Sequence, residues 1–246
     1  MTVPSNTQVD RLGERLRTGT LEDPDLTLLD DYRRSFAPAY EGVVNTLRKL
    51  GVQPTGRPAK STSSLIAKMK RETIRLSQVQ DIAGCRVLVA DLEEQDRLVA
   101  ALSRTFPKIT VVDRRTKPTH GYRAVHIIVE LFERAVEIQV RTESQHMWAE
   151  LSEKLSDLVD ASIKYGGGPT DVKDRLLNSS LALGAVEQSE RLFAEASRIM
   201  EEERETEETR RRVEAAQEQL TDLKAALVAA LKAAADTWIS DTKDRT

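Results

Sequence analysis

The stretch Val136-Glu137-Ile138-Gln139-Val140-Arg141-Thr142 alternates apolar and polar residues along one strand length. At a period of two, its three valine and isoleucine side chains point to one face of a β-strand, and Glu137, Gln139 and Arg141 point to the other. A half-buried strand commonly turns its polar face to water. The strand alone fits that role or a binding site equally well, and the segments around it favour the site.

Composition limits the classes of protein that this chain can represent. Its 246 residues are enough for a buried core, and we expect one domain with helical additions. Hydrophobic residues make up 39%, charged residues 31% and aromatic residues 4%, which is typical of a protein with long solvated helices. No apolar run approaches a bilayer span and no secretory signal is visible, so we expect no membrane contact and a cytoplasmic location.

The charge and the cysteine count exclude two further readings. A net charge of -3 argues against a general nucleic-acid coat protein, which carries a large basic surplus. Cys85 is the single cysteine and lies in an apolar run, so it forms no internal disulfide. We interpret it as a small buried packing residue rather than a nucleophile.

Periodicity divides the first part of the chain into helices and loops. Residues 1–24 are polar and predict a frayed arm or a short helix. Helical spacing predicts a helix over 26–50, with a kink or boundary at Pro38. A loop over 53–63 then precedes another helix, which Ser61 or Ser63 is expected to cap.

The middle of the chain alternates strands and a helix, as expected for a sheet. Strands are predicted at 82–90, 110–113, 124–132 and 135–141, and a helix at 93–106. Glu133-Arg134 is expected to form the hairpin turn between the last two strands. Thr142 and Gln145 resemble a capping box that opens the next helix.

The C-terminal part is helical by composition after a break at 165–169. Near its end, apolar residues recur at alternating three- and four-residue steps: Val213, Ala216, Leu220, Leu223, Leu227, Ala230 and Ala234. Such a short heptad seam is typical of a self-packing hairpin or of an oligomer contact. We predict homo-oligomerisation through these helices.

The polar residues suggest chemistry on a nucleotide. Asp81 begins one predicted strand and Glu137 lies on the polar face of another, so neighbouring strands would bring both carboxylates to one Mg2+ ion. A polyphosphate needs cations, and the chain supplies many: Arg57, Lys60, Lys68, Arg71 and Arg86, then Arg114, Arg115 and Lys117. Tyr122 beside Gly121 offers a flat surface for a base. Each feature has a structural alternative: Glu137 as the partner of a basic neighbour, and His126 as a core histidine.

Five short motifs in order carry a resemblance. They are Lys60-Ser61-x-x-Ser64-Leu65-x-x-Lys68, Asp81-Ile82-Ala83-Gly84-x-Arg86, Gly121-Tyr122-Arg123-x-x-His126, Glu137-Ile138-Gln139-Val140-Arg141-Thr142 and His146-x-Trp148-Ala149-Glu150. With this order and spacing, residues 56–155 resemble the synthetase domain of the RelA/SpoT family of alarmone synthetases.

This resemblance implies an α+β fold, a mixed β-sheet flanked by helices and related to nucleotidyltransferases, with helical N- and C-terminal extensions. The expected segments are 1–55 (helical), 56–160 (synthetase domain) and 161–246 (helical, with a possible short coiled coil). The implied activity is that of a GTP diphosphokinase, which moves pyrophosphate from ATP to the 3′-hydroxyl of GDP or GTP and so makes (p)ppGpp.

The resemblance also implies a role for each matching residue. Asp81 and Glu137 would be catalytic and would hold Mg2+, with Glu137 sharing the metal or activating the hydroxyl. The implied ATP-binding residues are Arg57, Lys60, Ser64, Lys68 and Arg86. The implied acceptor-binding residues are Lys117, Tyr122, His126 and Gln139.

The chain departs from the family pattern in two places, and these departures leave alternatives open. Pro58 stands where the family usually has an arginine, with Arg57 one residue earlier, and the segment before Gly121 is shorter and reads Lys117-Pro118-Thr119-His120. One alternative is a toxin-like relative that pyrophosphorylates the 3′ end of tRNA or makes adenosine alarmones. Another is a catalytically degenerate nucleotide-binding protein. None of the three histidines precedes an aspartate, so we expect no metal-dependent hydrolase of the family's long members.

Overall fold

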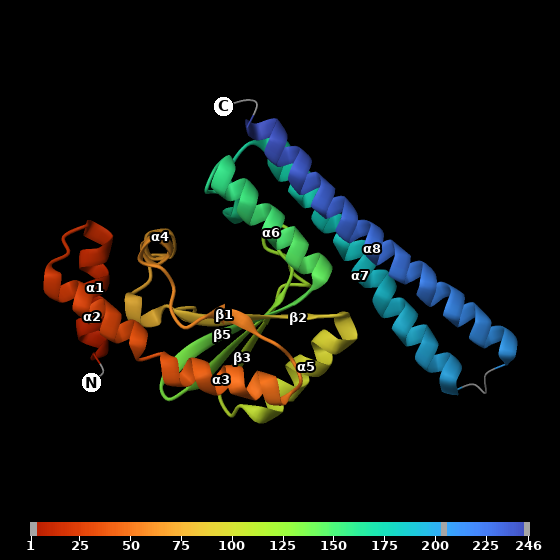
Figure 1. Ribbon diagram of the computed structural model, residues 1–246, viewed down its shortest axis with the longest axis horizontal. Helices are drawn as coiled ribbons and strands as arrows, with labels where there is room; N and C mark the ends of the chain where they lie inside the picture. The colour runs from red at the N-terminus through yellow and green to blue at the C-terminus, as the bar shows by residue number, and fades with distance from the viewer. Residues whose placement is uncertain (1–3, 203–205, 244–246) are drawn as a thin grey trace. The chain divides into compact units, whose positions relative to one another are not determined.

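The computed structural model describes residues 4–202 and 206–243 (Figure 1). Contacts divide the chain into two compact units. The first comprises the residues up to Val87 with Leu98–Val112 and His126–Val140, and the second comprises Leu88–Arg97, Asp113–Val125 and the residues from Arg141 onward. The units interleave along the sequence, so they do not test the three consecutive segments expected above. No helix within the described ranges is long and apolar enough to cross a membrane.

Three helices open the first unit: α1 (Asn6–Thr18), α2 (Asp23–Arg34) and α3 (Ala37–Lys49). Ser5 caps α1 in a reciprocal capping box with Gln8, so a defined helix stands where an arm or short helix was expected. The helix expected over 26–50 is divided between α2 and α3. Pro38 lies in the first turn of α3, where its missing N–H costs no hydrogen bond, and this confirms the boundary.

Two further helices and a 3-10 turn lie around the first long strand in the sequence. Helix α4 (Thr62–Glu72) begins after Ser61, whose hydroxyl accepts a hydrogen bond from the Ser64 N–H, as expected. A 3-10 turn, η1 (Leu76–Gln78), follows it, and α5 (Leu92–Thr105) comes after the first long strand.

The sheet is mixed, with five strands in the order β1-β2-β5-β4-β3. The strands are β1 (Thr55–Arg57), β2 (Ala83–Val89), β3 (Ile109–Asp113), β4 (Val125–Leu131) and β5 (Arg134–Thr142). Four of them confirm the predicted strands, whereas β1 lies in the segment expected as a loop. It is a short, exposed edge strand without apolar alternation, antiparallel to β2, with Arg57 opposite Gly84.

The hairpin between β4 and β5 turns at Phe132 and Glu133, one residue earlier than expected. Both residues have positive φ, 51° and 58°, which is the backbone of a two-residue hairpin turn. The expectation of Glu133-Arg134 was wrong because Arg134 belongs to the strand, where its Nε donates to the Ser35 hydroxyl at 2.9 Å.

The sheet separates an apolar face from a polar one. In β2 the buried residues Ala83, Cys85, Val87 and Val89 alternate with Gly84 and Arg86, which are partly exposed. Burial, together with the negative charge of Glu137, raises the pKa of the Cys85 thiol to about 12, which fits a packing residue and not a nucleophile. The polar face of the central strands is therefore the place to look for chemistry.

The second unit is largely helical. Its helices are α6 (Glu143–Leu158), η2 (Ile163–Tyr165), α7 (Thr170–Glu202) and α8 (Glu207–Lys243). The expected capping box of Thr142 and Gln145 opens α6, and α8 packs against both α7 and α6 (Figure 1). Their shared core contains Trp148, Leu155, Leu183 and Leu231.

The heptad seam is thus used within the chain, one of its two expected uses. Leu227 packs against the helical core, but Leu223 is 48% exposed, and the deeply buried positions of α8 are Leu231 and Ala235. Helix α8 contacts two helices rather than one, so its buried face differs from a two-stranded seam. The homo-oligomer stays a prediction.

Candidate functional site

Asp81 is held by two lysines in the first unit. It lies in the turn just before β2, and its carboxylate accepts hydrogen bonds from Lys60 Nζ at 2.5 Å and Lys68 Nζ at 2.9 Å. The Lys60 N–H donates to the Ile82 carbonyl at 2.7 Å, which fixes the loop beside the strand. Burial alone would raise the pKa of Asp81, but the hydrogen bonds and charges of the lysines lower it below its ordinary 3.8. Asp81 is therefore ionised at neutral pH.

Glu137 forms the second acidic centre, on the partly exposed face of β5. Its Oε1 lies 2.7 Å from His126 Nδ1 on β4, and its Oε2 accepts a hydrogen bond from Gln139 Nε2 at 2.8 Å. Burial raises the pKa of Glu137, yet contact with His126 and Gln139 outweighs it and the net pKa is lowered. The charge of Asp81 opposes this lowering, which means that the two carboxylates act on each other.

Gly84 lets two strands approach closely between these acids. A Cβ at this position would lie 3.1 Å from the Glu137 carbonyl oxygen, closer than side chains normally approach. Gly84 also pairs with Arg57 on β1. Arg57, Gly84 and Glu137 thus form a row across three adjacent strands, and Asp81 lies three residues before Gly84.

The donor set fits Mg2+. The described residues contain no group of three or more histidine, cysteine, aspartate or glutamate side chains arranged for a metal ion. One or two ionised carboxylates are the protein ligands that Mg2+ uses when nucleotide phosphates and water complete its octahedron. Asp81 and Glu137 would be those ligands.

The other predicted site residues of the first unit lie on three elements. Ser64 and Lys68 lie on α4, and Arg86 follows Gly84 on the same side of β2. Ser64 Oγ accepts a hydrogen bond from Ser61 Oγ at 2.8 Å. Arg57 is exposed on the edge strand.

Tyr122 and Lys117 belong to the second unit, where only Tyr122 has a defined setting. Its hydroxyl accepts hydrogen bonds from Arg141 Nη2 at 2.7 Å and Nε at 3.2 Å, and the guanidinium carbon of Arg141 lies 5.1 Å from the ring centroid. Arg141 is 2% exposed, so a buried guanidinium holds the Tyr122 ring in place. Lys117 is exposed.

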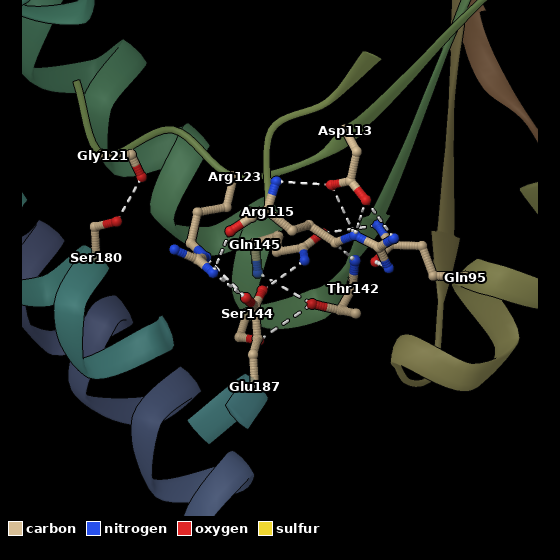
Figure 2. Close-up of polar contacts among 10 residues, drawn as sticks. All are labelled: Gln95, Asp113, Arg115, Gly121, Arg123, Thr142, Ser144, Gln145, Ser180 and Glu187. Atoms are coloured by element: carbon tan, nitrogen blue, oxygen red, sulfur yellow. Dashed lines mark hydrogen bonds and ion pairs between the residues drawn. The ribbon is translucent and has the colours of Figure 1, made fainter. Parts of the chain in front are cut away.

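A buried polar network in the second unit was not expected from the sequence (Figure 2). Arg115, counted above among the cations that could serve a polyphosphate, is only 8% exposed and pairs with Asp113 at 2.6 Å and Asp96 at 2.7 Å. Arg123, quoted above only as part of a motif, pairs with Glu187. Asp113 is only two residues from Arg115, but Asp96 and Glu187 are distant in sequence from their partners, and no local pattern predicts those contacts.

The lysine contacts of Asp81 predict a pH dependence of stability. Because the pKa of Asp81 is lowered on folding, its contribution to the free energy of unfolding is complete above its ordinary value of 3.8 and is lost as the pH falls through the folded pKa. Urea unfolding at pH 6 and pH 3 is expected to show a larger loss for the wild type than for Asp81→Asn. An equal loss in both proteins would mean that the lysines do not hold this carboxylate in solution.

Part of the chain matches a known family of proteins. Residues 56–158 match the family model described as the region found in RelA/SpoT proteins. Uncharacterised proteins of Mycobacterium tuberculosis and Mycobacterium bovis are each 36% identical to the chain over 179 residues, covering 67% of it. The chain spans 63% of the length of these curated relatives.

A solved structure shows the same fold. The small alarmone synthetase 1 from Bacillus subtilis, bound to its product pppGpp, superposes with a TM-score of 0.50 at 24% identity, covering 74% of this chain and 98% of that one. The expected fold class is confirmed: a mixed sheet with helices and helical extensions at both ends. The family model and the motifs together identify residues 56–158 of this chain as a RelA/SpoT synthetase region.

Proposed function

We propose that this chain is a (p)ppGpp synthetase, a GTP diphosphokinase that transfers the β,γ-pyrophosphate of ATP to the 3′-hydroxyl of GDP or GTP. One observation carries the proposal: within the RelA/SpoT region, Asp81 and Glu137 come from distant parts of the sequence, and yet the charge of Asp81 acts to raise the pKa of Glu137. A pair of ionised carboxylates near several cations suits phosphoryl-type transfer to a poor nucleophile.

The reaction assigns a task to each acid. The ribose 3′-oxygen bonds to the β-phosphorus of ATP, the bond from that phosphorus to the α–β bridging oxygen breaks, and AMP leaves. Asp81 and Glu137 would hold Mg2+, which when bound neutralises phosphate charge and supports the attacking oxygen. Glu137 is oriented by His126 and Gln139, and it would also accept the proton of the acceptor 3′-hydroxyl.

The lysines would change partners when ATP binds. Lys60 and Lys68 both contact Asp81 in the structure. The ATP phosphates are stronger anions than one carboxylate, so we assign these lysines, with Ser64 and Arg86, to the polyphosphate. Asp81 then becomes available to the metal. Arg57 remains the candidate for adenine stacking.

The acceptor contacts are proposed for Tyr122, His126, Gln139 and Lys117. The ring of Tyr122 is braced by Arg141 and would stack on the base. The basic segment before Gly121 gives less support to an RNA acceptor than its sequence suggests. Arg115 forms ion pairs with Asp113 and Asp96, and Arg114 Nη1 donates to the Thr119 hydroxyl at 2.6 Å. Fewer cations of this segment are therefore available to bind the phosphates of an RNA backbone.

The decisive experiment compares acceptors. Labelled ATP and Mg2+ are incubated with GDP, GTP, ADP or tRNA in separate reactions, and products are resolved by chromatography. Label is expected on GDP or GTP. Label on tRNA or ADP alone would replace the proposed acceptor, and measurable ATP binding with no product from any acceptor would indicate a degenerate member.

A further inference from the structure

The segment 114–124, here called the acceptor loop, joins β3 to β4 and carries Lys117 and Tyr122. Its backbone includes two left-handed residues, His120 with φ 53° and Gly121 with φ 86°. A non-glycine residue in this region costs free energy and persists only where its surroundings enforce it. The second unit holds the loop at three points (Figure 2).

The first anchor is at the start of the loop. Arg115 Nε and Nη2 donate to the Asp113 carboxylate at 3.0 Å and 2.6 Å, and Nη1 donates to Gln95 Oε1 at 3.1 Å. Gln95 is fully buried on α5. A guanidinium with this many partners has one geometry, so the backbone at 115 is fixed.

The second anchor joins the end of the loop to α7. Arg123 Nε donates to Glu187 Oε2 at 2.8 Å, and Arg123 Nη2 donates to the Arg115 carbonyl at 2.6 Å. Arg123 therefore ties the two ends of the loop together. Glu187 is 4% exposed, and its other oxygen accepts a hydrogen bond from Gln145 Nε2 at 2.6 Å.

The third anchor lies between the first two. The Ser180 hydroxyl on α7 donates to the Gly121 carbonyl at 2.6 Å. A Cβ on Gly121 would lie 2.8 Å from the Trp148 ring. Helix α7 thus contacts the loop at the residue immediately before Tyr122 and again at Arg123.

We propose that Glu187 on α7 is a positioning residue for the acceptor, acting through Arg123 to hold the acceptor loop in its binding geometry. Helix α7 lies outside residues 56–158, so the C-terminal helices would hold the acceptor loop as well as pack with each other. The inference rests on the proposed function, which assigns acceptor contacts to Lys117 and Tyr122. A buried ion pair contributes little net stability relative to an apolar pair of the same shape, whereas it fixes one arrangement of the groups that it joins.

Two substitutions at Glu187 separate positioning from simple loss of packing. Glu187→Ala removes both oxygens, and the acceptor KM is expected to rise by about 10- to 100-fold, the effect of a small misplacement, while the ATP KM stays unchanged. Glu187→Gln keeps an oxygen for Arg123 and is expected to recover part of this loss. Glu195→Ala is the matched control because Glu195 is exposed on the same helix.

Hydrogen exchange gives a readout that needs no turnover. Two amides report on the loop: the Tyr122 N–H donates to the Thr119 carbonyl at 3.0 Å, and the Arg114 N–H donates to the Ala124 carbonyl at 2.9 Å. In Glu187→Ala these amides are expected to exchange about tenfold faster or more, while the amides of α3, which lies outside this network, keep their wild-type rates.

The outcomes are distinguishable. Unchanged loop exchange with an unchanged acceptor KM overturns the proposal, and so does an equal rise of both KM values with a general increase in exchange. If the wild type transfers pyrophosphate to no acceptor, the proposed function fails, and exchange alone then decides whether Glu187 holds the loop.

Discussion

Glu137→Gln is expected to lower the turnover number by about 10³-fold, a loss of several kcal/mol of transition-state stabilisation. The amide keeps the size of the side chain and can keep a contact with Gln139, but it loses the negative charge that would hold Mg2+ and the capacity to accept a proton. Asp81→Asn is expected to have a similar effect for the first of these reasons. Initial rates with saturating ATP and GDP measure both.

The matched control for these amides is Glu130→Gln. Glu130 lies on β4 of the same sheet, but its side chain is 56% exposed and contacts only Lys108, at 3.4 Å, among the ion pairs found. This variant is expected to turn over at the wild-type rate. If either active-site amide variant also matches the wild type, the two-carboxylate mechanism is wrong, whatever the fold.

Local patterns predicted most of the sheet. The alternation in 136–142 placed Glu137 and Gln139 on one face of β5, and the structure has both on the partly exposed face. Caps were equally readable, because Ser61 and Thr142 are short-range signals. The edge strand β1 was not predicted, because its three exposed residues show no apolar alternation and their extended conformation depends on pairing with β2.

The sequence did not predict the contacts of the candidate site that arise only in the tertiary structure. The sequence predicted that Asp81 and Glu137 share a site, but not that Lys60 and Lys68 both contact Asp81. Arg115 and Lys117 look alike in the sequence, and only the fold shows that the first is buried against Asp113 while the second is exposed. Glu187 was unreadable because its partner Arg123 is distant in the chain and its own neighbourhood is an ordinary helix.

Gly121→Ala is expected to lower the free energy of unfolding by about 2–4 kcal/mol and to raise the acceptor KM. Alanine at φ 86° accounts for about 1 kcal/mol of this loss, and the remaining 1–3 kcal/mol comes from overpacking against Trp148. The indole ring cannot give way easily, because Trp148 is 2% exposed and its N–H donates to the Leu176 carbonyl and the Ser179 hydroxyl, each at 3.0 Å. The ring would push the acceptor loop instead.

Gly51→Ala isolates the contact from the backbone strain. Gly51 has φ 83°, close to that of Gly121, and no atom lies within 4 Å of the position of an added Cβ. Its substitution is therefore expected to cost only about 1 kcal/mol and to leave both KM values unchanged. Urea unfolding measures the free energy of unfolding of both alanine variants. The difference between their losses is the cost of placing a Cβ at position 121 against the Trp148 ring. If the two variants lose the same unfolding free energy, the acceptor loop has room to move at Gly121. The contact with Trp148 would then not be what holds Tyr122 in position.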